Sequence, residues 1–70
     1  MKSANKPCSE FGKAIKIKLV EMNKTQSWLI EELRLRLPDT YVDGSLLHKI
    51  MIGSVLSGKT VEEIHNILKI

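Results

Sequence analysis

The residues of this 70-residue sequence whose types and spacing best suit recognition lie in one short segment, residues 42–53. Asp43 is typical of a helix N-cap, because its carboxylate can accept from backbone N–H groups one turn on, and Gly53 can end the helix in the left-handed conformation. Three apolar residues at helical spacing would face inward: Leu47, Ile50 and Met51. Four small or polar residues would face outward: Gly44, Ser45, His48 and Lys49. This outward face suits close approach to a groove, and it equally suits a helix that meets only solvent.

The other reactive side chains form no recognisable catalytic or metal-binding pattern. Cys8, His48 and His65 do not have the spacing of zinc ligands, and the acidic pairs at residues 31–32 and 62–63 are typical of solvated helix faces. We find no nucleophile–base pairing and no phosphate-cradling glycine loop. A chain of 70 residues leaves little room for a water-excluding pocket. We therefore expect no enzyme activity, no cofactor, no bound metal and no small-molecule substrate.

Composition and charge indicate one small domain with a weak preference for anionic partners. The net charge is +3, from 11 basic and 8 acidic residues, and six of the basic residues lie in residues 1–24 against two acidic ones. Such a basic first third favours contact with phosphates or an anionic surface. The single cysteine, Cys8, suits a reducing compartment. Because neither a membrane-spanning apolar run nor a secretion signal is visible, we expect a cytoplasmic protein without membrane contact.

Apolar periodicity predicts a flexible tail at residues 1–8 and a folded domain at residues 9–70. Ser9 and Glu10 would begin a first helix that runs through Met22. The inward stripe of this helix has spacings of four, four and three residues: Phe11, Ile15, Leu19 and Met22.

Thr25 is expected to cap a second helix. Its inner face would be Leu29, Ile30, Leu33 and Leu37. The alternation of leucine and arginine over residues 33–37 would equally suit a half-buried strand. We favour the helix because the stripe begins at Leu29 and because Glu, Leu and Arg favour helix. Pro38 would end this helix and begin a turn.

A last helix is expected after a loop at residues 54–58, whose Val55 and Leu56 would cover the core. Thr60 would cap this helix, with Glu63 completing a capping box. Its apolar face would be Val61, Ile64, Ile67 and Leu68. The predicted fold class is thus all-α, with four or five helices. The predicted core is Phe11, Ile15, Leu19, Leu29, Leu33, Leu47, Ile50, Ile64, Ile67 and Leu68.

Four short motifs occur in a characteristic order. They are Phe11-Gly12-Lys13-x-Ile15, Met22-Asn23-Lys24-Thr25-Gln26-x-x-Leu29, Val42-Asp43 and Leu46-Leu47-His48-Lys49-Ile50-Met51-Ile52-Gly53. With these motifs the sequence resembles the Cro/repressor (Xre-type) family of helix-turn-helix DNA-binding regulators, from about Phe11 to Ile70. It looks especially like short regulators of phages and mobile elements, whose second helix carries a run like Trp28-Leu29-Ile30. The resemblance implies a small lambda-repressor-like domain. Residues 34–41 extend the connection between the second and third helices beyond the tight turn of the family.

The resemblance also implies which residues contact DNA. Gln26, with Ser27 beside it, would meet the DNA backbone at the start of the second helix. The third helix would lie in the major groove, where Asp43 would be its cap rather than a base contact. The implied contacts on that helix are Gly44, Ser45, His48 and Lys49. In the extended connection, Arg34, Arg36 or the Pro38–Tyr41 corner could touch the DNA backbone or a partner.

The leading hypothesis is a sequence-specific, repressor-like transcriptional regulator of phage or mobile-element origin that binds double-stranded DNA as a homodimer. Dimerisation would supply affinity that one small module lacks. The candidate dimer surfaces are the last helix with Ile70, and Ile17 or Val20 on the first helix; the sequence does not choose among them. One alternative is a protein-interaction module, such as an antirepressor or inhibitor. Another is an excision or architectural factor that bends DNA.

Overall fold

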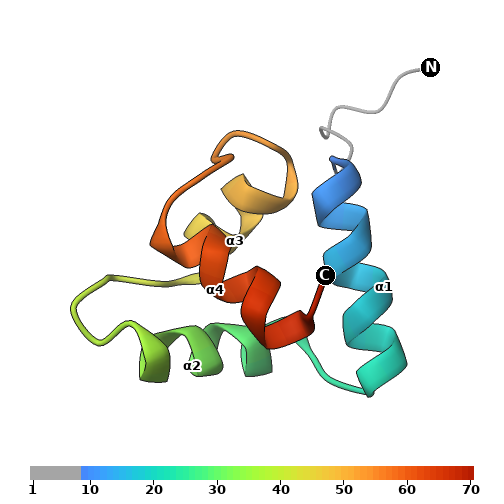
Figure 1. Cartoon of the computed structure of the whole chain (residues 1–70), viewed down its shortest axis with the longest axis horizontal. Helices are drawn as coiled ribbons and strands as arrows, with labels where there is room; N and C mark the ends of the chain where they lie inside the picture. The colour runs from blue at the N-terminus through green and yellow to red at the C-terminus, as the bar shows by residue number, and fades with distance from the viewer. Residues whose placement is uncertain (1–8) are drawn as a thin grey trace.

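A computed structural model describes residues 9–70, which contain four α-helices and no strand (Figure 1). The helices are α1 (Glu10–Met22), α2 (Gln26–Arg36), α3 (Gly44–Met51) and α4 (Lys59–Leu68). The all-α class and the four expected helices are therefore confirmed, while the predicted tail at residues 1–8 lies outside the described residues. None of the described helices is long and apolar enough to cross a membrane.

Local hydrogen bonds begin three of the helices where the sequence places them. Ser9, Thr25 and Asp43 each accept a side-chain hydrogen bond from the N–H three residues further on, at 2.9–3.0 Å. Asn23 ends α1 with a left-handed backbone at φ 59°, and Gly53 follows α3 with φ 87°. Short polar side chains and glycine satisfy or terminate the free backbone groups at helix ends, so these boundaries are determined locally.

Residues 33–37 form the end of α2 rather than a strand. The helix continues through Arg36, and Leu37 is its C-cap immediately before Pro38. Leu33 is fully buried whereas Leu35 is 76% exposed. A strand would instead place these two side chains on the same face, with similar burial, because its side chains alternate with a period of two. The helical interpretation is confirmed.

Two expectations for the segment before α4 are wrong. The helix begins at Lys59 after Gly58, whose φ is 120°, and no side chain caps it. Gly58 adopts a backbone conformation that other residues rarely take, so the helix starts before Thr60 can serve as its cap. Thr60 is instead buried inside the first turn, so no capping box forms. Leu56 is 77% exposed and does not cover the core; Val55 does pack against it.

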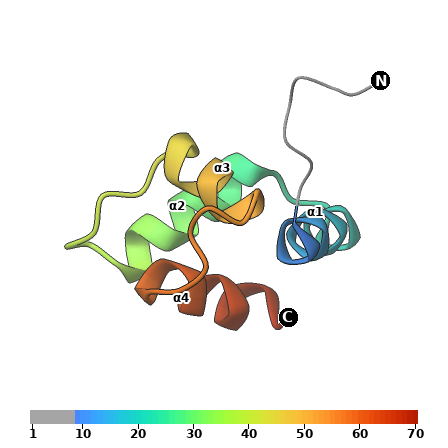
Figure 2. The same cartoon turned by 90° about the horizontal axis from the view of Figure 1, so that it is seen from above.

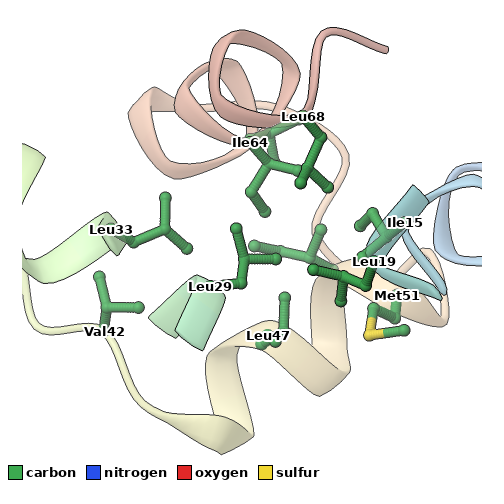
Figure 3. Packing of buried hydrophobic residues seen from close by; sticks show 11 residues of the cluster. Ile15, Leu19, Leu29, Leu33, Val42, Leu47, Met51, Ile64 and Leu68 are labelled. Atoms are coloured by element: carbon green, nitrogen blue, oxygen red, sulfur yellow. The ribbon is translucent and has the colours of Figure 1, made fainter. Parts of the chain in front are cut away.

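The buried core contains residues from all four helices (Figure 3). It consists of Ile15, Leu19, Leu29, Leu33, Val42, Leu47, Ile50, Met51, Val61, Ile64 and Leu68. Two residues expected in the core, Phe11 and Ile67, are only partly buried against it. The Phe11 ring instead stacks on His65, with ring centroids 4.6 Å apart, and so links α1 to α4. Phe11 lies one turn before Ile15, in the first turn of α1, where it packs against the border of the core and stays partly exposed.

The first turn of α1 meets the end of α3 backbone to backbone. The Met51 carbonyl oxygen accepts from the Ser9 N–H at 2.8 Å and from the Ser9 hydroxyl at 2.9 Å. Gly12 is buried against the same carbonyl, and a Cβ built on Gly12 would overlap the Met51 oxygen. Glycine is therefore required at this position for α1 to approach α3 as closely as it does.

Gly12→Ala is expected to lower the free energy of unfolding by about 1–3 kcal/mol, because the added methyl group must push α1 away from Met51. Gly44→Ala is the matched control. No atom lies within 4 Å of a Cβ at Gly44, and alanine in a helix is favoured over glycine by about 0.5–1 kcal/mol. Urea denaturation followed by circular dichroism measures both variants. Equal stabilities would contradict the close approach at Gly12.

Candidate nucleic-acid interface

The two sides of α3 differ in burial as the sequence predicts. Its inward residues are all buried: Leu47, Ile50 and Met51. Its four outward residues are all exposed: Gly44, Ser45, His48 and Lys49. The helix therefore presents two small residues, an imidazole and an ammonium group on one accessible side. These groups can donate hydrogen bonds, and the cation can pair with an anion.

The N-terminal end of α3 is open. Gly44 is its first residue, and no atom lies within 4 Å of the position a Cβ would take there. The nearest acidic group, Asp43, turns its carboxylate to the helix end, where one oxygen accepts from the Leu46 N–H at 2.9 Å. The positive end of the helix dipole offsets this negative charge. An incoming surface can thus approach the first turn closely.

Polar contacts hold α3 at both of its ends. At the C-terminal end, the Met51 carbonyl is held by Ser9. At the N-terminal end, the Arg34 Nε donates to the carbonyl oxygen of Val42 at 2.8 Å, directly before the cap residue. Arg34 thereby ties the seven-residue connection between α2 and α3 back onto α2. These two attachments hold the ends of α3, while its buried residues determine which side faces outward.

Arg36 has a different role from Arg34. Its guanidinium lies 3.4 Å from the Glu63 carboxylate, and both side chains are partly exposed, at 47% and 27%. This ion pair joins α2 to α4 and does not touch α3. Both arginines thus belong to α2 rather than to the connection, and the structure gives each a partner within the chain. Whether either also contacts DNA or another protein stays a prediction.

The first turn of α2 lies on the same side of the molecule as α3, with α4 on the opposite side (Figure 2). Gln26 and Ser27 are the first two residues of α2, and both are exposed. The Thr25 side chain accepts from the Trp28 N–H. The N–H groups of Gln26 and Ser27 have no acceptor within the helix, because they belong to its first turn. The six predicted contact residues are thus all exposed, on α3 and on the first turn of α2, which lies on the same side of the molecule.

Four residues make contacts that the sequence does not predict. Ser9 is a cap that also binds the Met51 carbonyl, and Gly12 and Arg34 act through contacts with distant residues that no local pattern reveals. Lys24 lies just before α2, with its ammonium 5.3 Å from the ring centroid of half-buried Trp28. The short spacing from Lys24 to Gln26 is the one signal that could have added a cation to the predicted set.

No protein-family model, curated protein or solved structure matches this chain. Within residues 9–70, no three metal-ligating side chains come together in a way that could hold a metal ion.

Arg34→Ala is expected to destabilise the domain by about 1–2 kcal/mol, because the carbonyl oxygen of buried Val42 loses a charge-assisted hydrogen bond. Arg36→Ala removes the same type of side chain two residues away, from an exposed ion pair, and should cost less than about 1 kcal/mol. Thermal and urea denaturation of the two variants compare them directly. A larger loss for Arg36→Ala would show that Arg34 does not anchor α3.

Proposed function

We propose that this protein is a sequence-specific, repressor-like DNA-binding regulator whose helix α3 enters the major groove of double-stranded DNA. The open N-terminal end of α3 is the observation that carries the proposal. Apart from its chain neighbours and the backbone of its own helix, no atom lies within 4 Å of the position that a Cβ would take at Gly44, and the outward residues after it are exposed. A helix that approaches bases through its first turn requires this freedom, because bulk at that end would hold it out of the groove.

The arrangement of α2 and α3 supports the same proposal. The first turn of α2 lies on the side where α3 displays its outward residues (Figure 2). Exposed N–H groups and the Gln26 amide at the start of α2 can bind a phosphate while α3 lies in the groove. Together the two helices form a helix-turn-helix unit with a seven-residue connection, of the lambda-repressor-like type that the sequence motifs imply.

Position along α3 assigns different roles to its exposed residues. Ser45 lies in the first turn, and His48 follows one turn later, so both would meet base edges and discriminate among sequences. Lys49 lies further along, and its long side chain would reach a phosphate. Gln26 would likewise add affinity for the backbone. The protein would then act sterically, since an occupied operator excludes polymerase.

Selection from a random library of DNA duplexes tests the proposal and supplies a preferred sequence. Fluorescence anisotropy then measures binding to that duplex and to a scrambled one at several salt concentrations. Lys49→Ala should weaken binding to both and lower the salt slope by about one unit. His48→Ala should cost roughly 1–3 kcal/mol on the preferred duplex and little on the scrambled one.

Lys59→Ala is the matched control for Lys49→Ala. It removes one exposed cation at the start of α4, on the side away from α3, and should retain the salt slope of the parent protein. Failure of the library to yield an enriched duplex would contradict the proposal. So would folded His48 and Lys49 variants that bind every duplex as the parent does. A protein-interaction role, as in an antirepressor, would then take its place.

A further inference from the structure

Ile17 and Val20 form an exposed apolar surface on α1, on the side of the helix that faces away from the core. Their side chains are 59% and 78% exposed. Together with Lys16 and Glu21 they line a shallow hollow in the surface, which we call the α1 patch. The two apolar side chains are thus neighbours in one hollow, which a cation and an anion border, whereas a single exposed apolar residue would be ordinary.

We propose that the α1 patch binds the α1 patch of a second copy of this chain, with the two α1 helices antiparallel. A two-fold contact requires a surface that complements itself. A two-fold axis between residues 18 and 19 would set Ile17 opposite Val20 of the second copy. The same axis would set Lys16 opposite Glu21 of the second copy. The cation at one border of the hollow and the anion at the other thus form two attractive pairs per dimer.

The next residues outward place one constraint on this pairing. Lys13 would lie opposite Lys24 of the second copy, a repulsive arrangement. The Lys13 ammonium lies 4.0 Å from the Glu10 carboxylate of its own helix, which offsets part of that repulsion. The repulsion that remains between these lysines would weaken the dimer.

The placement of α1 agrees with a two-fold DNA complex. Figure 2 looks nearly along α1, which lies at the edge of the molecule with α3 and α4 both to one side of it. The two-fold axis of an antiparallel pair is perpendicular to both helices and to the line that joins them. The two-fold axis would therefore run from the α4 side to the α3 side of each copy. Both copies of α3 would then face the same way.

The expected spacing is also close to that of DNA half-sites. Packed helices lie about 8–10 Å apart. Three such spacings, from α3 to α1, between the two α1 helices and from α1 to α3 of the second copy, would separate the two copies of α3 by roughly 25–30 Å. Half-sites in two-fold operators lie about 34 Å apart. This spacing argument rests on the proposed function, whereas the dimer itself is argued from the α1 patch and is tested without DNA.

Sedimentation velocity from micromolar to millimolar concentration tests the dimer. Four residues per copy cover far less than the roughly 800 Å² per partner of stable complexes, so the dimer should appear only towards the upper end. Lys16→Glu and Glu21→Lys should each raise the dissociation constant about three- to tenfold, because two attractive pairs become repulsive. The double variant should restore the parent value. Glu62→Lys makes the same charge change as Glu21→Lys on exposed α4 and should have no effect.

Disulfide trapping tests the pairing itself. In a Cys8→Ser background, a mixture of the Ile17→Cys and Val20→Cys variants should cross-link to each other faster than either variant cross-links to itself. A chain that stays monomeric at millimolar concentration would overturn the proposal. A double charge variant weaker than both single variants, or preferential cross-linking of like variants, would also overturn it. Failure of DNA binding would leave all these results unchanged, so the two proposals are distinguishable.

Discussion

The position of α3 depends on one backbone oxygen, the carbonyl of Met51. It accepts two hydrogen bonds from Ser9 and lies directly against Gly12, so α1 and α3 meet without intervening side chains. The last carbonyls of a helix have no partner within that helix. Here the residues at the start of another helix supply the partner, and the same contact holds the C-terminal end of α3 against α1.

An eight-residue helix has little stability of its own, because helices shorter than about 12–15 residues are marginal in water. Packing must therefore hold α3 in place. Leu47 and Ile50 supply a fully buried inner side, and attachments at Met51 and Val42 hold the two ends. Because the inner side and the ends of α3 supply its stability, its outward residues are not needed to hold the helix in place. Its composition can follow the requirements of a partner instead.

The sequence predicted those features that depend on neighbouring residues. Asp43 caps α3 because its carboxylate and the N–H it accepts from are three residues apart, and the spacing of residues along α3 determined which side is buried. Thr60 matched the same local pattern, but the prediction that it caps α4 was wrong, because the helix begins one residue earlier, after Gly58. The contact of Arg34 with Val42 and the proximity of Gly12 to Met51 depend on how helices pack, which no local spacing encodes.

The two attachments of α3 close loops of very different length. Arg34 and Val42 are eight residues apart, whereas Ser9 and Met51 are 42 residues apart. Detachment of α1 frees a whole helix at one end of the described chain, whereas an opening between α2 and α3 frees only the seven residues that connect them. Partial unfolding should therefore begin with α1, leaving α3 tied to α2 at one end. Amide hydrogen exchange at the hydrogen-bonded N–H groups of α1 would then be faster than at those of α2.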